Sequence, residues 1–532
     1  MITSTLTILD DSEGEYEDDF FHRRDQNQHV RGPLGGGWLL HDTVKALNRL
    51  VGGCEHCRRS ELTLLGRCLY AIAFGVDGQG PQGGVPVLRQ AFEDTYAQYK
   101  KNPKMMTTPF RLRLDIRREA RELGRYPWEF LFKPDPEGGG FFLAGEQTEL
   151  VLSRYVHNED VALPEADSGP LRILVVLSRP NSPGLAQVRA DTLIRAVEEL
   201  RSVGTTVDVL DSPTRDQLRN DLLQHPTHIL HFIGHGRGGA HGRGSGLALK
   251  KDERELRTAR ALAEARRARG EDLAEQVDEA DWADSVSICN LLRAGLDGPP
   301  GPSGASPRGR LIFLHACEGD SPDVTEDSLR GFSSIARDLA HRERVAAVVA
   351  MQYVISIDDA ERFAVHFYSW LRAGYLLDEA VSRARCELGT TPGFGRESWD
   401  HRCFGTPVIY VREASAFRRY ADMWRQAGNE SQGTAGQSES GGKKYCPNTS
   451  CKDGFIIPGQ TRCRACNSQV MDCPRSGCQG LVMTAPGSEC TVCDFKVASR
   501  EEPMVSDGHE QDAVSMRRRA RTGPRPNTRV RS

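Results

Sequence analysis

Short apolar runs recur along the chain between residues 171 and 412. The run 171–177 (LRILVVL) is apolar almost throughout, and similar runs follow at 227–236 (THILHFIGHG), 311–320 (LIFLHACEGD) and 345–353 (VAAVVAMQY). Each is short and rich in β-branched or aromatic residues, which is typical of a strand buried on both faces of a parallel sheet. The pattern therefore predicts a sheet whose strands lie inside the protein.

Longer segments with apolar residues at helical spacing separate these runs. They are 186–203, 214–223, 287–296, 329–342, 358–372 and 376–388, and two further strands are expected at 207–210 and 408–412. Strands that alternate with helices indicate an α/β fold. We expect a doubly wound, mostly parallel sheet with flanking helices.

The N-terminal part has a different pattern. Residues 1–36 are acidic and then Gly-rich, so we expect a disordered tail. Helical spacing returns at 41–51 and 61–74, and residues 109–116 (PFRLRLDI) alternate like an edge strand with one solvated face. Farther along, 251–284 is dense in Arg, Glu and Ala, which predicts a charged helical insertion and a candidate processing or regulatory loop.

These patterns divide the chain into six parts. We expect a disordered tail (1–36), an N-terminal region (37–160), an α/β core (161–413), a Ser/Gly/Gln-rich linker (414–444), a Cys-rich module (445–496) and an Arg-rich disordered tail (497–532).

Charge and composition narrow the class of protein. The 532 residues have a net charge of -4, but residues 10–19 hold seven acids and residues 517–531 hold seven arginines. No apolar run approaches the roughly 20 residues of a membrane helix, and no signal peptide is visible. We expect a cytoplasmic protein. Of its 15 cysteines, those with paired spacing near the C-terminus indicate metal binding and not disulfides.

Two of the apolar runs end at reactive side chains. The run 227–236 reaches His235, and the run 311–320 contains Cys317. The carboxyl ends of parallel strands face the ligand crevice, and a nucleophilic cysteine needs a neighbouring imidazole to take its proton. We predict that Cys317 is a nucleophile and His235 its general base, with no cofactor for catalysis.

Other residues near these strand ends have competing interpretations. His231 shares a strand face with Ile229 and Ile233 and is expected to be a buried, hydrogen-bonded core residue. His315 lies two positions before Cys317 and is a candidate for the substrate pocket. Asp320 follows the nucleophile and is a second pocket candidate, although acids in loops are more often simply solvated.

Several segments together resemble one known family. They include PWEFLF (127–132), LRILVVLSRP, HFIGHG, LHACEGD, LDEAVSRARCEL and TPVIYVR, which span roughly residues 40–412. In this order they resemble the CHAT family of caspase-like cysteine peptidases, relatives of caspases, separase and gingipains. The resemblance implies a caspase-like fold, His235 and Cys317 as catalytic residues, and the backbone amides of Gly236 and Cys317 as oxyanion donors.

The C-terminal module contains an internal repeat of cysteines. Cys446, Cys451, Cys463 and Cys466 have the spacing C-x4-C-x11-C-x2-C, and Cys473, Cys478, Cys490 and Cys493 repeat it 27 residues later. Four thiolates suit tetrahedral zinc. We therefore predict two structural Zn2+ sites in a double zinc ribbon, with no open position for water.

The sequence as a whole predicts an intracellular cysteine endopeptidase that acts on protein substrates. The resemblance implies controlled proteolysis in bacterial defence, stress or cell-death signalling, with a protein activator or recruiter that docks on the zinc ribbon. Nucleic acid is a possible partner of the basic tail. The alternative is a non-catalytic caspase-fold scaffold, or a regulator that binds protein or nucleic acid through the ribbon and tail.

Overall fold

The computed structural model describes most of residues 2–412 and small parts of the C-terminal region. The segments up to 412 that it does not describe are 19–27, 55–56, 79–83, 103–105, 107, 121, 157–170, 183–184, 186–187, 189, 202–204, 226, 238–245, 270–276, 297–309, 319–330, 343–344 and 391–397. After 412 it describes 444–445, 455–456, 468–472, 481–484 and 488. Residues Met1–Gln432 form one compact unit and Gly433–Ser532 a second.

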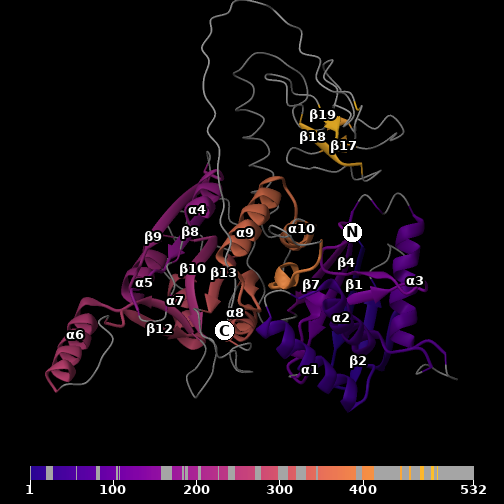
Figure 1. Ribbon diagram of the computed structural model, residues 1–532, viewed down its shortest axis with the longest axis horizontal. Helices are drawn as coiled ribbons and strands as arrows, with labels where there is room; N and C mark the ends of the chain where they lie inside the picture. Colours follow the sequence, from indigo (N-terminus) through magenta and orange to yellow (C-terminus); the bar gives the residue numbers. More distant parts are fainter. Residues whose placement is uncertain are drawn as a thin grey trace, which may run out of the picture. The chain divides into compact units, whose positions relative to one another are not determined.

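The first unit is built around one large mixed sheet (Figure 1). Its strands are β1 Ile2–Ile8, β2 Glu13–Asp18, β3 His29–Pro33, β4 Phe110–Ile116, β7 Leu150–Tyr155, β8 Leu171–Leu177, β9 Thr205–Asp211, β10 Ile229–Arg237, β11 Gly246–Lys250, β12 Ala280–Asp284, β13 Arg310–Glu318, β14 Val345–Met351 and β15 Pro407–Val411. The helices are α1 Trp38–Gly53, α2 Arg59–Phe74, α3 Val87–Lys101, α4 Asp191–Glu198, α5 Arg215–Gln224, α6 Glu253–Ala268, α7 Ser285–Leu296, α8 Gly331–Arg342, α9 Ile357–Arg372 and α10 Leu377–Thr390.

The sheet consists of two parallel blocks. In one block the order is β9-β8-β10-β13-β14, and in the other it is β15-β7-β4-β1. The two blocks meet where β14 and β15 run antiparallel. Antiparallel β2 and β3 extend one end of the sheet, and the antiparallel pair β11 and β12 joins β10 beyond the end of β8. The fold is thus α/β with a mostly parallel sheet, as the sequence predicts.

Apolar residues cover both faces of the first block. One face packs against α4 and α9 through residues such as Ile173, Phe313 and Phe363. The other packs against α5, α7 and α8 through residues such as Val176 and Ile312. All seven residues of β8 are buried, because an interior parallel strand has no solvated face.

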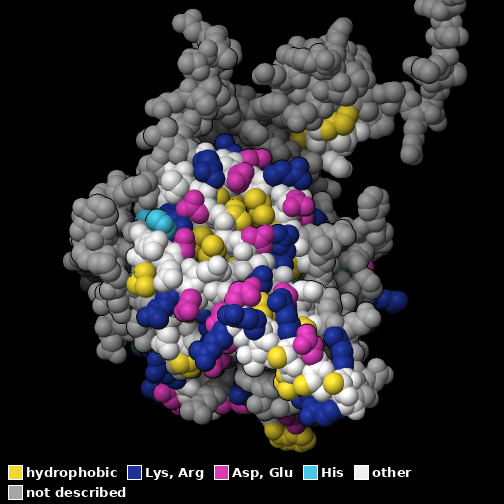
Figure 2. Space-filling view, turned by 90° about the vertical axis from the view of Figure 1, so that its left-hand side faces the viewer, with side chains coloured by type: hydrophobic (Ala, Val, Ile, Leu, Met, Phe, Trp, Pro, Cys, Tyr) yellow, Lys and Arg dark blue, Asp and Glu magenta, His cyan; other side chains and the backbone are white. Residues whose placement is uncertain are grey.

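At the border of this block away from β14, β9 is an edge strand in which Thr205 and Val207 are buried and the residues from Asp208 on are not. Arg172 pairs with Asp208, and Arg179 with Asp211. Figure 2 shows side chains of both signs interspersed on the side of the molecule that bears β9. Charged side chains at an edge discourage pairing with a strand of another chain.

The prediction of a disordered tail over 1–36 is wrong, because these residues supply β1, β2 and β3. The acids of β2 alternate with buried residues, among them Tyr16. This period of two places the apolar side chains on one face, and the number of acids concealed it. The prediction of an edge strand at 109–116 is also wrong. Strand β4 is an interior strand, because it pairs with β1 on one side and with β7 on the other.

The segment 251–284 is only partly a charged helical insertion. It contains α6, whose N-cap is Asp252 and whose one buried residue is Leu256. Its last residues form β12, which pairs with β11 and buries Ala280 and Ala283. The residues 280–284 therefore belong to the sheet, with both alanines buried, and are not part of a free loop.

The described residues of the second unit form two small antiparallel pairs. β16 Lys444–Tyr445 pairs with β17 Phe455–Ile456, and β18 Val470–Asp472 pairs with β19 Leu481–Met483. The second pair follows the first at nearly the spacing of the cysteine repeat.

Candidate active site

Strands β10 and β13 are parallel neighbours that end at the same edge of the sheet. Their register pairs Ile229 with Leu311 and, at the carboxyl ends, His235 with Cys317. Neighbouring strands lie about 4.8 Å apart, so the backbones at positions 235 and 317 adjoin although many residues separate them in sequence. The two strand ends that carry the predicted base and nucleophile are thus brought side by side.

The side chain of His235 is buried, with 5% of the residue exposed. Successive side chains of a strand alternate between faces, so His235 lies on the face of Ile229, His231 and Ile233, which α9 contacts through Tyr368. The structure describes the side chains of β13 as far as His315 and its backbone as far as Glu318. Cys317 is therefore placed by its backbone and register, and the two catalytic roles stay predictions.

Gly236 lies between two paired strands. It pairs with Leu247 of β11 on one side and with Glu318 of β13 on the other. A backbone amide in this position points along the sheet toward a neighbouring strand. The oxyanion role of the Gly236 amide stays a prediction, and it requires that this amide not be used by the β11 ladder.

His231 is the buried, hydrogen-bonded core residue that the sequence predicts. Its Nδ1 is 3.0 Å from the Tyr368 hydroxyl oxygen, and its ring stacks on Phe313 at 4.2 Å between centroids. Burial, with His315 nearby, holds the pKa of His231 well below its ordinary value. This histidine is neutral and inaccessible, so it is no rival to His235 as a catalytic base.

His315 lies on the same face of the sheet, two positions before Cys317, and its ring centroid is 5.8 Å from that of His231. Burial lowers the pKa of His315 to about 4. His315 is therefore a neutral imidazole at neutral pH. Its pocket role stays a prediction, and Asp320, the other pocket candidate, lies outside the described residues.

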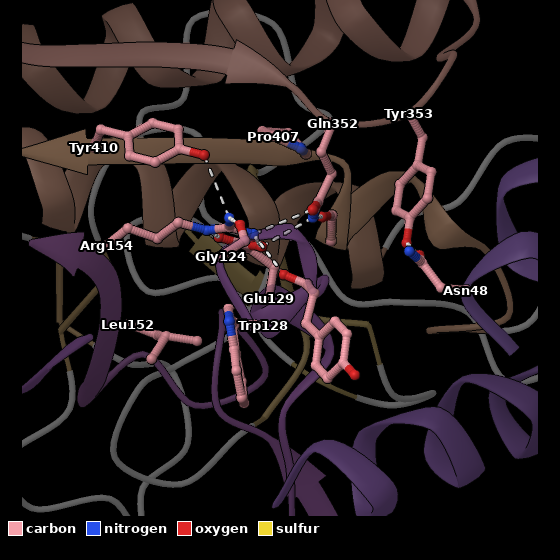
Figure 3. Close-up of polar contacts among 12 residues, drawn as sticks. Asn48, Gly124, Trp128, Glu129, Leu152, Arg154, Gln352, Tyr353, Pro407 and Tyr410 are labelled. Atoms are coloured by element: carbon pink, nitrogen blue, oxygen red, sulfur yellow. Dashed lines mark hydrogen bonds and ion pairs between the residues drawn. The ribbon is translucent and has the colours of Figure 1, made fainter. Parts of the chain in front are cut away.

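A buried charged network holds the end of β14 beside this edge (Figure 3). Arg154 of β7 donates to the Glu129 carboxylate from Nε at 2.9 Å and from Nη2 at 2.6 Å. The Gln352 amide, directly after β14, accepts from Arg154 at 3.2 Å and donates to Glu129 at 2.9 Å and to the Gly405 carbonyl at 2.6 Å. Since β14 is the neighbour of β13, this network fixes the segment next to the Cys317 strand.

The network holds one carboxylate and two guanidinium groups. Burial would raise the pKa of Glu129, but the Arg154 charge holds it below its usual value. Arg385 of α10 is fully buried, donates to the carbonyls of Pro407 and Leu152, and lies 3.9 Å from Glu129. Burial lowers the pKa of Arg385 to about 10. The single negative charge of Glu129 thus compensates two buried cations.

Sequence reasoning did not assign a role to Glu129 or Arg154. Both are charges inside apolar segments, PWEFLF and LVLSRYV, and such a charge is rarely buried unless paired. This signal could have suggested a buried pair. It could not have named Gln352 as the third partner, because nothing in the sequence indicates which amide meets the pair.

One group of described side chains combines three metal-ligating types: Asp359, His401 and Cys403, all buried. His401 Nδ1 accepts a hydrogen bond from the Cys403 backbone amide at 3.1 Å, which caps the 3-10 helix Arg402–Gly405. Asp359 accepts from Arg362 at 3.1 Å. The lone pair that a metal would need on Nδ1 is therefore in use, and we interpret the group as structural.

The eight cysteines of the predicted zinc sites lie outside the described residues. The described strands nevertheless flank them, because β16 ends directly before Cys446 and β18 directly before Cys473. Cys451 lies a few residues before β17, and Cys478 a few residues before β19. None of the described helices is long and apolar enough to cross a lipid bilayer. In a search for relatives, no curated protein matches the chain.

The CHAT domain family matches residues 101–400, more than half of the chain. The protein therefore belongs to the CHAT domain family. The match spans the strands β10 and β13, their flanking helices and the Glu129–Arg154 pair.

Three solved structures resemble the chain at low sequence identity. The Arg-specific cysteine proteinase gingipain R has a TM-score of 0.34 and 11% identity, over 62% of this chain and 68% of its own. A complex of pro- and mature domains of RgpB from Porphyromonas gingivalis gives 0.35 and 12%, over 62% and 70%. The Saccharomyces cerevisiae separase–securin complex gives 0.39 and 12%, over 77% of this chain but 30% of that one.

Proposed function

We propose that this protein is a caspase-like cysteine endopeptidase in which Cys317 is the nucleophile and His235 the general base. The observation that carries the proposal is the register of β10 and β13, which makes His235 and Cys317 partners at the carboxyl edge of the sheet. Membership of the CHAT domain family supports it. Protein substrates follow from this assignment.

The proposed reaction has two halves. His235 takes the proton of the Cys317 thiol, and the sulfur attacks a peptide carbonyl carbon. The resulting tetrahedral intermediate collapses as His235 returns the proton to the leaving amine, which leaves a thioester on Cys317. His235 then takes a proton from water, whose oxygen attacks the thioester and releases the acid and the free thiol.

Backbone amides of Gly236 and Cys317 are the proposed oxyanion donors, and one such donor typically changes the rate by a factor of about 100 to 1,000. Gly236 is paired with Leu247 of β11, so this role requires that its amide is not donated to β11. This requirement agrees with a peptidase that an activator switches on. The setting we propose for it is bacterial defence, stress or cell-death signalling.

For the second unit we propose a double zinc ribbon that recruits a protein activator or target. Its support is the cysteine repeat together with the strand pairs β16–β17 and β18–β19, which place each C-x4-C segment between two antiparallel strands. The arginines after Met516 are proposed to add salt-dependent contact with phosphates.

A peptide library tests the proposed function. The purified protein is incubated with a mixed peptide library, and new termini are identified by mass spectrometry for the wild type, Cys317→Ala, His235→Ala and the control Cys386→Ala. Cys386 is a half-buried thiol of α10, so its replacement should leave cleavage intact. Cleavage that persists in Cys317→Ala and His235→Ala contradicts the proposal and favours a non-catalytic scaffold.

A further inference from the structure

Two buried histidines next to the candidate active site have ring nitrogens that no described group satisfies. They are Nε2 of His231 and Nδ1 of His315, and both atoms are shielded from solvent. A buried polar atom without a hydrogen bond costs about 1–3 kcal/mol, so a pair of them on one face of a sheet suggests a missing link between them. The rings lie 5.8 Å apart between centroids.

The proton on His231 can be placed from its other partner. The Tyr368 hydroxyl lies 3.0 Å from Nδ1, and burial raises the pKa of Tyr368, so the phenol keeps its proton. Among the described residues the hydroxyl has no second hydrogen bond, so donating to Nδ1 is the arrangement that uses its hydrogen. A neutral His231 whose Nδ1 accepts carries its own hydrogen on Nε2.

His231 Nε2 is then a donor, and His315 Nδ1 is available as an acceptor. No direct hydrogen bond joins the two rings among the described contacts, and one ordered water can link a buried donor and a buried acceptor that are both unsatisfied. An accepting Nδ1 places the hydrogen of neutral His315 on Nε2. The residual 6% exposure of His315 does not include Nδ1, so the exposed part of the residue lies elsewhere.

We propose that Tyr368 and His231, through one bridging water, fix His315 as the Nε2–H tautomer, which presents a neutral hydrogen-bond donor beside the position of Cys317. Tyr368 and His231 are positioning residues, and His315 is the group that meets the substrate. The ligand that such a donor recognises is an acceptor oxygen of the bound peptide. The substrate role of His315 rests on the proposed peptidase function, whereas the relay itself does not.

The relay differs from simple core packing in what it controls. Phe313, which stacks on His231, would orient the ring equally well for either tautomer. The hydroxyl of Tyr368 distinguishes the two ring nitrogens, because one of them accepts from it. Removing this hydroxyl therefore changes the proton position on His231 and, through it, on His315, with little change in packed volume.

The test uses the full chain labelled with 15N in its histidine rings. NMR spectra correlate each ring nitrogen with the ring protons and so distinguish the two tautomers, and His315→Gln and His231→Gln assign the signals. We expect His315 as Nε2–H at pH 7 in the wild type. Tyr368→Phe should shift His315 toward a mixture of tautomers, whereas Tyr375→Phe, a hydroxyl deletion outside the relay, should leave it unchanged.

An Nδ1–H or charged His315 in the wild type, or an identical His315 spectrum in Tyr368→Phe, would overturn the relay. Peptide cleavage tests its consequence separately. We expect kcat/KM to fall about 10-fold in His315→Leu and to be largely retained in His315→Gln, which keeps a donor. If the tautomer responds to Tyr368→Phe but no variant cleaves peptide, the proposed function fails and the relay stands.

Discussion

Buried neutral histidines make the free energy of unfolding of this protein depend on pH. His315 has a pKa of about 4 in the folded protein, against about 6.5 in an unfolded chain. As pH falls from 6.5 to 4, the unfolded chain binds a proton that folded His315 does not, so the free energy of unfolding decreases. The stabilisation is complete above pH 6.5, and the pKa of His231 is lowered in the same direction.

This coupling is measurable by urea unfolding at pH 7 and pH 5. Cys317→Ala serves as the background so that proteolysis does not interfere. Between pH 7 and pH 5 we expect the unfolding free energy of this protein to fall by about 2 kcal/mol more than that of the same protein with His315→Gln. The reason is that pH 5 lies about 1.5 units below the pKa of histidine in the unfolded chain, so the unfolded chain binds a proton that folded His315 does not. Equal losses in both proteins would show that His315 is not held neutral.

We expect that removing the buried charge of Glu129 lowers the unfolding free energy of the first unit strongly. Glu129→Gln leaves Arg154 and Arg385 buried without a counter-charge, and such a change typically costs about 3–5 kcal/mol of unfolding free energy. Glu122, whose ion pair with Arg125 is half-exposed, provides the control. Glu122→Gln should cost less than about 1 kcal/mol, and similar costs for the two variants would argue against the network.

For single residues, the sequence indicates whether a side chain is buried or lies at a strand end better than it indicates which side chain it contacts. The position of His235 and Cys317 at strand ends, and the burial of His231, could be predicted from strand patterns, because these depend on positions close in sequence. The Glu129–Gln352 contact and the Tyr368–His231 bond join residues far apart. Such contacts depend on how helices and strands pack, which no local pattern encodes.

Among the elements, β1 is expected to be essential to the sheet. It pairs with β4 along its whole length and buries Leu6 and Ile8. A chain that begins at Gly37 loses β1, β2 and β3 and leaves β4 as an unprotected apolar edge. We expect this truncation to aggregate or to melt at a much lower temperature.

The matched control ends the chain after Gln432, which removes the second unit and leaves the first intact. Its melting temperature should equal that of the same unit in the full chain. Size-exclusion chromatography and thermal melting compare the two truncations. If the chain that begins at Gly37 is as monomeric and stable as the control, β1 does not have the role that its pairing indicates.

Sequence patterns predicted elements best where burial is complete. The bounds of β8 match the predicted strand, because every position is buried and no polar residue interrupts the run. The sequence does not indicate β1 to β3, because the acids of β2 and the glycines after β3 dominate the composition of this segment. β11 and β12 are too short for an amphipathic pattern, and their pairing with the end of β10 depends on the whole chain.

For the whole molecule, the proposed zinc content is two ions per chain. Elemental analysis of the purified protein should give about two zinc ions, and Cys446→Ser should lower this to about one, since each site needs four thiolates. The control Cys386→Ser changes a thiol of the first unit and should keep both ions. A zinc content that is below one in the wild type, or unchanged in Cys446→Ser, would contradict the double ribbon.

The central claim is that His235 makes the thiol of Cys317 reactive. The most direct measurement is the rate at which iodoacetamide alkylates Cys317 between pH 5 and 8, followed by peptide mass spectrometry, with exposed Cys54 as the internal reference. We expect Cys317 to react at least about 10-fold faster than Cys54 at pH 6, because an imidazolium partner favours the thiolate. In His235→Ala this advantage should disappear. A Cys317 rate that is no faster than that of Cys54, or that is the same with and without His235, would contradict the account.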